Sequence, residues 1–165
     1  MKIAIVDEYD QLIGAKAPGD MSELDTYRVA RLVIINAQSQ VLLAQRALTK
    51  KKDPGLWGLA VEGTVEEGES YEANIRKEAE EEIGITLGAI ETGPKLHTIG
   101  KYNHWSQLFI YRADLEIDRL AIQIEELAQL AWLSYPELVH DVAINPEKYG
   151  FKFNSILPKI EAYFD

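Results

Sequence analysis

The sequence predicts a single α/β (α+β) domain, in which short strands form a sheet and a few helices pack against it. One observation behind this prediction is a series of short apolar runs separated by Gly, Pro, Asn and Asp, as is typical of strands and turns. Another is a run without Gly or Pro from 70 to 83, as is typical of a helix. The 165 residues, of which 47% are hydrophobic and 27% charged, are enough to bury one core without disulfides.

The N-terminal half predicts strands that alternate with turns. Residues 2–16 place short apolar runs on either side of the polar segment 7–10, which predicts a β-hairpin, and a loop follows to residue 25. Residues 27–35 contain the run LVII, which is apolar on both faces and predicts a central strand. Further strands are predicted at 41–45 and 56–61.

The C-terminal half predicts more strands and two helices. The expected strands are 85–90, 96–102, 107–115 and 128–133, with a break at Gly93-Pro94 and a connection at 103–105. Residues 122–127 are expected to form a loop or a strand edge. The motif SYPE at 134–137 is a capping box with Pro in the first turn, so a helix is predicted from there to residue 142. A last amphipathic helix is predicted at 155–164.

The helix predicted at 70–83 carries an unusual cluster of charge. Ser70 is a suitable N-cap and Gly84 a suitable C-terminal stop. Glu78, Glu81 and Glu82 follow an i, i+3, i+4 spacing, so their carboxylates share one face. The three negative charges repel one another, and their position near the C-terminal end of the helix opposes the helix dipole. The alternative interpretation is a solvated acidic face on an exposed helix. A divalent cation would relieve both penalties, and clustered carboxylates favour Mg²⁺ or Mn²⁺ over zinc.

The charge and the cysteine content limit the classes of function. A formal net charge of −10 argues against a long nucleic acid as partner, but it allows a small anionic substrate beside a metal. The absence of Cys excludes disulfides and thiolate catalysis, and it fits a cytoplasmic protein. The apolar run within the first ten residues is too short for a signal peptide. No apolar segment of the sequence is long enough to predict a membrane span.

The basic, aromatic and histidine residues offer weaker signals. The segment RALTKKKDPG at 46–55 is the one concentrated basic stretch, and its cations are expected to meet phosphates unless it is only a solvated loop. The tryptophans are interpreted first as core or rim residues, any of which could stack on a base: Trp57, Trp105 and Trp132. The histidines show no ligand spacing and are interpreted as structural or surface residues: His97, His104 and His140.

Residues 63–85 resemble the Nudix box, G-x5-E-x7-R-E-U-x-E-E-x-G-U, where U is a bulky aliphatic residue. The positions that match are Gly63, Glu69, Glu78, Glu81, Glu82, Gly84 and Ile85. Lys77 stands where the family has Arg, and Ala79 stands where it has a larger aliphatic residue. A match at fixed spacing over such a span is far more specific than a lone glycine motif. Lys77 is expected to hold a carboxylate of the box, less firmly than Arg would.

The resemblance implies a Nudix-type α/β/α sandwich with a mixed β-sheet, to which the N-terminal hairpin is added. It also implies hydrolysis of a nucleoside diphosphate linked to another group. Glu78 and Glu82, with Glu81, are expected to hold Mg²⁺ or Mn²⁺, and Glu81 and Glu82 are both candidates for the general base. In the loop before the helix, Glu69 and Glu66 are expected to reach the outer shell of the metal.

The resemblance further implies an acidic residue near a later strand that ends in Trp. Glu126 is the choice for this role, with Glu125 second. The expected substrate-binding residues are Arg46, Lys50, Gly63 and Trp57. A small nucleoside diphosphate derivative is the expected partner, and a homodimer is a further expectation.

Within the family, the sequence around residues 6–85 resembles isopentenyl-diphosphate isomerase. That enzyme needs a Cys just before the box glycine and a His two residues later, where this chain has Glu62 and Thr64. Isomerisation is therefore not expected. A catalytically weak nucleotide-binding or regulatory module stays the alternative to a hydrolase, because Lys77 and Ala79 depart from the box.

Overall fold

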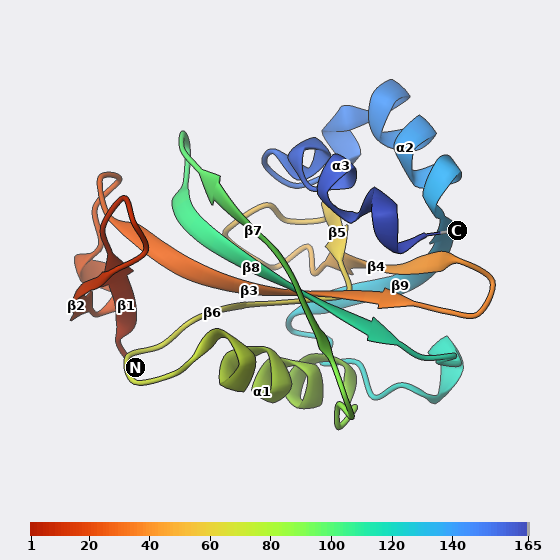
Figure 1. Cartoon of the computed structure of the whole chain (residues 1–165), viewed down its shortest axis with the longest axis horizontal. Coiled ribbons are helices and arrows are strands. Elements are labelled where there is room, and N and C mark those ends of the chain that lie inside the picture. Colours follow the sequence, from red (N-terminus) through yellow and green to blue (C-terminus); the bar gives the residue numbers. More distant parts are fainter. Residues whose placement is uncertain (165) are drawn as a thin grey trace.

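A computed structural model describes residues 1–164, in which nine strands form one curved mixed sheet with helices on both faces (Figure 1). The strands are β1 Ile3–Val6, β2 Leu12–Lys16, β3 Thr26–Ile35, β4 Gln40–Arg46, β5 Trp57–Leu59, β6 Val61–Thr64, β7 Glu91–Thr98, β8 Asn103–Arg112 and β9 Leu127–Ser134. The α-helices are α1 Tyr71–Ile83, α2 Tyr135–Ile144 and α3 Leu157–Ile160. Short 3₁₀ turns cover Pro18–Asp20, Ile117–Arg119, Pro146–Lys148, Phe153–Ser155 and Glu161–Tyr163.

Strand β3 lies at the centre of the sheet. It pairs with β8 in parallel along its whole length, while β6 pairs with its middle, β1 with its start and β4 with its end, all antiparallel. Leu32, Val33 and Ile34 are completely buried, which confirms a strand that is covered on both faces.

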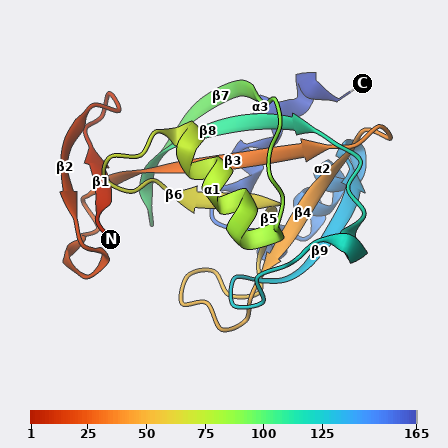
Figure 2. The same ribbon diagram turned by 90° about the horizontal axis from the view of Figure 1, so that it is seen from below.

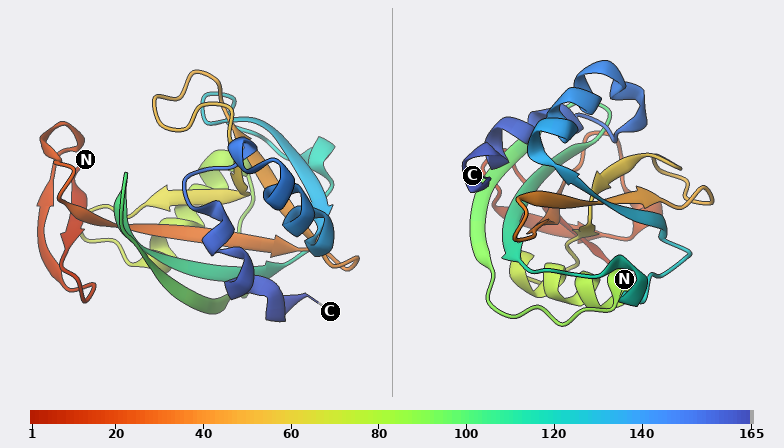
Figure 3. Two further views of the ribbon diagram at one scale, coloured as in Figure 1. Left: turned by 90° about the horizontal axis from the view of Figure 1, so that it is seen from above. Right: turned by 90° about the vertical axis from the view of Figure 1, so that its right-hand side faces the viewer.

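The alternation of side chains along β3 divides the core into two layers. Leu32 and Ile34 belong to the core beneath α1, whereas Val33 and Ile35 belong to the core beneath α2 and α3. The α1 residues that complete the first core are Ile75, Ala79 and Ile83. The sheet therefore lies between α1 on one face and the C-terminal helices on the other, as predicted (Figures 1 and 3).

The predicted N-terminal hairpin is present as β1 and β2, at the end of the sheet away from α2 (Figure 2). Its turn is tied to the body by the buried Asp10, which adopts a left-handed conformation with φ of 60°. Arg28 Nε donates to Asp10 at 2.7 Å, the Tyr71 hydroxyl donates at 3.0 Å, and Lys95 Nζ lies at 2.5 Å. Asp10 thus joins the hairpin to β3, α1 and β7.

The prediction of a strand at 85–90 is wrong. After Gly84 this segment is a loop, and β7 begins at Glu91 and runs through the Gly93-Pro94 pair with an irregularity in register. The loop carbonyls of Leu87 and Gly88 accept hydrogen bonds from Arg76 Nη1, at 2.8 and 3.0 Å. A side chain therefore satisfies backbone groups that a neighbouring strand would otherwise pair.

Two other boundaries also differ from the predictions. Residues 103–105 belong to β8 instead of a connection, because the turn lies at 99–102, where Asn103 Oδ1 accepts from the Gly100 amide at 3.0 Å. The helix predicted at 155–164 is reduced to the four-residue α3 between 3₁₀ turns. Pro158 sits at the start of α3 and lacks the amide hydrogen needed inside a longer helix.

In the part of the chain that the structure describes, no helix combines the length and the apolar character that a membrane crossing requires. The treatment of residues 1–165 as one domain stays a prediction, and Asp165 lies outside the described residues.

Candidate active site

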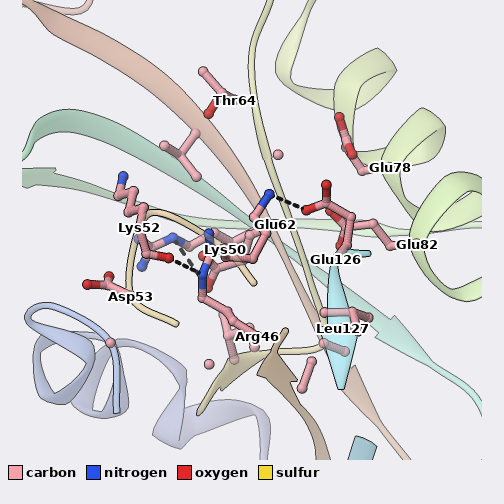
Figure 4. Close-up of a pocket in the computed structure, with 18 of the residues that line it drawn as sticks. Arg46, Lys50, Lys52, Asp53, Glu62, Thr64, Glu78, Glu82, Glu126 and Leu127 are labelled. Carbon is pink, nitrogen blue, oxygen red and sulfur yellow. Dashed lines mark hydrogen bonds and ion pairs between the residues drawn. The ribbon is translucent and has the colours of Figure 1, made fainter. Parts of the chain in front are cut away.

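A cavity of about 590 Å³ opens between α1, the basic loop after β4 and the turn after Tyr149. Acidic residues from α1 and the loop before β9 form one side of it, and Arg46, Lys52 and Asp53 lie on another (Figure 4). The predicted site residues that line the cavity are Glu78, Glu81, Glu82, Glu126, Lys77, Arg46, Lys50, Gly63 and Trp57. The structure thus brings together residues that are up to 80 positions apart, from Arg46 to Glu126.

Helix α1 places its carboxylates at the cavity, because capping residues fix both of its ends and close packing fixes its position on the sheet. Ser70 Oγ accepts from the Ala73 amide at 3.0 Å, and Gly84 ends the helix in a left-handed conformation with φ of 72°. Gly63 on β6 lies directly beneath α1, where a Cβ atom would come within 2.4 Å of Glu78 Cγ. Only glycine therefore allows α1 to lie close enough to place its carboxylates at the cavity.

The carboxylates of Glu78 and Glu82 lie near each other in a partly desolvated position. Burial first, and then the charge of Glu78, raises the pKa of Glu82 to about 9, and its side chain is 8% exposed. Burial first, and then the charge of Glu81, raises the pKa of Glu78 to about 7. Glu81 itself is exposed at the rim. The pair therefore retains a proton near neutral pH unless a cation replaces it.

Glu126 is held next to this pair by the loop that precedes β9. The Gln123 amide donates to the carbonyl of Glu82 at 2.9 Å, and the Ala47 amide donates to the carbonyl of Glu126 at 2.9 Å. Lys50 Nζ lies 2.6 Å from Glu126 Oε2 (Figure 4). Glu126 lines the cavity, whereas Glu125 is exposed and does not.

The donor set suits a hard divalent cation. Among residues 1–164, no three acidic, His or Cys side chains are already close enough to enclose a metal ion. What the structure offers is the neighbouring carboxylates of Glu78 and Glu82, with Glu81 and Glu126 also lining the cavity. All these ligands are oxygen atoms, which Mg²⁺ and Mn²⁺ prefer, and a cation would remove the repulsion that raises both pKa values.

Lys77 binds two carboxylates of the loop that leads into α1. Its Nζ lies 2.6 Å from Glu66 Oε2 and also contacts Glu69 Oε1. Burial alone would lower the pKa of Lys77, but these two acidic partners raise it. Glu69 Oε2 in turn accepts from the Glu66 amide and from Asn74 Nδ2, both at 2.9 Å. Glu69 does not line the cavity, and its contacts hold the loop in shape.

We expect replacement of Lys77 by Met to lower kcat by about tenfold with little change in KM. The loop that joins Gly63 to α1 would lose its central cation, and displacement of a reacting group by about 1 Å can cost up to ~10²-fold in rate. Lys77→Arg should restore kcat to at least the wild-type value, because the guanidinium can grip both carboxylates. Steady-state kinetics on these variants, with the exposed Lys159→Met as control, test the expectation. Wild-type kcat in Lys77→Met would contradict it.

Sequence reasoning missed several residues that line the cavity. Arg31, Glu62, Tyr102 and His104 were not among the predicted site residues, yet all line the cavity, and Lys52 was expected there only as one cation of the basic segment 46–55. Arg31 left a usable signal, because it and Arg28 place charges in the predicted central strand, where a buried strand has apolar residues. His104 is buried, as a structural residue would be, but its Nε2 lies 3.3 Å from Arg31 Nη2.

Glu66, which was expected near the metal, lines the cavity, as does Thr64, whereas His97, His140, Trp105 and Trp132 lie away from it. His97 stacks on Trp105, with ring centroids 4.3 Å apart, and His140 is exposed on α2. Trp132 Nε1 donates to the carbonyl of Leu115 at 3.2 Å. Of the three tryptophans, Trp57 is the one on the cavity wall.

A sequence model of the NUDIX domain matches residues 26–153, which include β3, the carboxylate helix and the loop of Glu126. The chain belongs to the Nudix family. The cavity of this Nudix protein therefore lies where α1, the helix of the Nudix box, meets the sheet. The match, together with relatives that are themselves named Nudix hydrolases, makes the chain a Nudix pyrophosphohydrolase.

Two relatives illustrate the range of similar sequences. An uncharacterized Nudix hydrolase of Pseudomonas aeruginosa is 29% identical over 143 residues, which are 86% of this chain and 82% of that protein. An isopentenyl-diphosphate Delta-isomerase of Nocardia farcinica is 28% identical over 159 residues, which are 90% of this chain and 88% of that protein.

Solved structures share the fold. A Deinococcus radiodurans protein superposes with a TM-score of 0.83 at 19% identity, covering 96% of this chain and 98% of its own. The NUDIX domain of Shewanella oneidensis NrtR, solved with ADP ribose, gives a TM-score of 0.65 at 19% identity, covering 89% and 92%. A C. elegans Ap4A hydrolase, solved as a binary complex, gives 0.57 at 20% identity, covering 82% and 96%.

Proposed function

We propose that this Nudix protein uses Mg²⁺ or Mn²⁺ to hydrolyse the diphosphate bond of a nucleoside diphosphate linked to another group. The observation that carries the proposal is the Glu78–Glu82 pair, whose partly desolvated carboxylates share a cavity wall with Glu81 and Glu126. Such a pair lacks a counter-charge of its own, since Lys77 is engaged by Glu66 and Glu69.

The acidic wall would act on the phosphates of the substrate. A diphosphate resists attack by water until its negative charge is neutralised. A bound Mg²⁺ or Mn²⁺ would polarise the phosphoryl oxygens and make a bound water more acidic. Glu78, Glu82 and Glu126 would hold this ion, and a carboxylate not saturated by it would accept the proton of the attacking water. Glu81 and Glu82 are the candidates for that base.

The basic side of the cavity would orient the substrate. Arg46 is held at the cavity because its Nε donates to the carbonyl of Lys52 at 2.8 Å, which leaves its remaining donors for phosphate oxygens. Lys50 contacts Glu126, so its ammonium is close to the expected position of the diphosphate. Trp57 offers an aromatic surface for stacking. Both ADP ribose and Ap4A, which are named for two structural neighbours, are small nucleotides with phosphoanhydride bonds.

The two alternatives have less support. The isomerase relatives do not make isomerisation the preferred proposal, because the chain has no Cys and carries Glu62 and Thr64 at the two positions concerned. The weak-module alternative rests on Lys77 and Ala79. Ala79 is completely buried beneath the sheet, and Lys77 is bound to two carboxylates, so both departures fit an ordered box.

We expect chelation of the metal to abolish turnover and to lower the melting temperature. A ligand that binds only the folded state stabilises it by mass action. The experiment incubates the protein with ADP-ribose, dinucleoside polyphosphates, coenzyme A, nucleoside triphosphates and isopentenyl diphosphate, in Mg²⁺, Mn²⁺ or EDTA. Metal-dependent release of a monophosphate product supports the proposal. Full activity in EDTA would contradict the metal assignment, and isomerised isopentenyl diphosphate would favour the isomerase.

The proposed substrate is a small nucleotide. The proposed location is the cytoplasm, and the proposed assembly is a homodimer. These last two points stay predictions from sequence.

A further inference from the structure

The cavity has a second polar wall, on the sheet face opposite α1. Arg31 on β3 pairs in register with Glu62 on β6 and with Leu108 on β8. Leu108 belongs to the core beneath α2, whereas the next β3 residue, Leu32, belongs to the core beneath α1. Because side chains alternate between the two faces of a sheet, Arg31, Glu62 and His104 lie on the α2 face.

Two nitrogen atoms on this wall, Arg31 Nε and His104 Nδ1, have no hydrogen-bond partner among residues 1–164. Arg31 has a side chain that is 13% exposed, and its Nε lies 3.8 Å from the nearest carboxylate oxygen, on Glu62. That Nε makes no hydrogen bond to any of residues 1–164. His104 is 3% exposed, and its Nε2 accepts from the Arg31 guanidinium, so its proton resides on Nδ1. Nδ1 has no partner in the described chain either, and buried unpaired donors are costly without a ligand.

Lys52 adds an ammonium group to the same wall. Lys52 is an exposed residue, and its Nζ donates to the Tyr27 hydroxyl at 2.7 Å and lies 3.8 Å from the centre of the Tyr102 ring. No carboxylate of residues 1–164 lies within ion-pair distance of this ammonium. Loss of hydration lowers the pKa of Lys52 to about 8, although Glu62 and Asp53 oppose the effect. Lys52 is thus a cation that lacks an anionic partner.

We propose that Arg31, Lys52 and His104 form a subsite for a phosphate monoester that the substrate carries in addition to the diphosphate being cleaved. A phosphate offers several strong acceptors, which suit a planar guanidinium, an ammonium and an imidazole N–H. The proposal rests on the proposed function and specifies its substrate class. Glu62 and Asp53 are the acidic residues near these three groups. Glu62, at 3.8 Å, compensates the Arg31 charge only in part, and Asp53 lies 3.8 Å from Lys101.

The position of the subsite separates it from the place of cleavage. The proposed metal ligands Glu78 and Glu82 come from α1, on one face of the sheet, whereas Arg31 and His104 lie on the other face. Residues of both groups line the one cavity, together with Glu62 and Gly63 of β6. A substrate with its diphosphate at α1 therefore reaches the second wall with a more distant part. An anionic group in that part would satisfy these donors and balance the charges of Arg31 and Lys52.

Binding without turnover tests the subsite. Two pairs of compounds serve as probes, NADP⁺ with NAD⁺ and coenzyme A with dephospho-coenzyme A, since the members of each pair differ by one phosphate monoester. Calorimetric titration in EDTA prevents hydrolysis. We expect the wild type to bind at least one phosphorylated member about tenfold or more tightly than its partner, as a charge-assisted hydrogen bond would produce. No preference in either pair would overturn the proposal.

Variants show whether the named residues cause the preference. Arg31→Gln and Lys52→Gln should each reduce it about tenfold, whereas the neighbouring Lys51→Gln, exposed and away from the cavity, should keep it. Arg31→Lys retains the charge and serves if Arg31→Gln fails to fold. Equal weakening of both members of a pair would mean that these donors bind the common diphosphate, which contradicts the proposal. Hydrolysis without any phosphate preference would overturn the subsite and leave the proposed function standing.

Discussion

Replacement of Glu82 by Gln is expected to lower kcat by on the order of 10²-fold or more, because a metal-ligating carboxylate is lost. Gln has nearly the same shape, so the packing of α1 against the sheet should not change. Glu80, on the same helix, is exposed and does not line the cavity, which makes Glu80→Gln the matched control. Steady-state kinetics at saturating Mg²⁺ on the two variants measure the difference.

The same substitution should not reduce stability. Glu82 is a buried carboxyl group beside Glu78, and its raised pKa shows that its charged form is disfavoured in the fold. A neutral amide removes this repulsion, so the free energy of unfolding in EDTA should equal or exceed that of the wild type. If Glu82→Gln unfolds, or if its kcat matches that of Glu80→Gln, the carboxylate pair has a structural role and not a catalytic one.

Replacement of Asp10 by Asn is expected to lower the free energy of unfolding by roughly 2–4 kcal/mol. Asp10 is 8% exposed and binds Arg28, Lys95 and Tyr71, so removal of its charge leaves two cations unbalanced. The upper end of the range is discounted because Lys95 is partly exposed. Asn tolerates the left-handed conformation of this turn, so backbone strain does not contribute. Urea denaturation provides the measurement, with the exposed Asp118→Asn as control.

The contribution of Asp10 should depend on pH with a definite sign. Burial alone would raise the pKa of Asp10, but hydrogen bonds from Lys95, Arg28 and Tyr71 lower it below its ordinary value of 3.8. A carboxylate with a lowered folded pKa stabilises the protein above the unfolded value, and the effect is lost as pH falls through the folded pKa. The difference between wild type and Asp10→Asn should therefore be full at neutral pH and shrink below about pH 4. A difference that is unchanged or larger at low pH would contradict this network.

The sequence predicted the carboxylate helix well because the signals for it are local. Ser70, Gly84 and the spacing of Glu78 and Glu82 define the ends and the acidic face of α1 within fifteen residues, and the structure has these ends and brings both carboxylates to the cavity. The central strand was equally predictable, because the run LVII at 32–35 in β3 is apolar on both faces. In both cases the residues that determine the element lie inside it.

The parts that the sequence did not predict depend on contacts between distant residues. The loop at 85–90 has the composition of a strand, but two of its carbonyl groups, those of Leu87 and Gly88, accept hydrogen bonds from Arg76 and not from a neighbouring strand. Glu69 was expected in the outer shell of the metal. In the structure, Lys77 and Asn74 of α1 bind its carboxylate oxygens, so Glu69 holds the loop before α1 instead. The wall formed by Arg31 and His104 exists only because β3 and β8 are neighbours in the sheet. None of these contacts leaves a regular spacing in the chain.

Binding of Mn²⁺ tests most directly whether the carboxylates of α1 form a metal site. Electron paramagnetic resonance reports free Mn²⁺, so a titration gives the affinity of each variant without any substrate. We expect the wild type and Glu80→Gln to bind Mn²⁺ with the same affinity. Glu78→Gln and Glu82→Gln should bind it about 10- to 100-fold more weakly, because each lacks a carboxylate that binds the metal or orients a metal ligand. Equal affinity in all four proteins would contradict the assignment of this helix as the metal site.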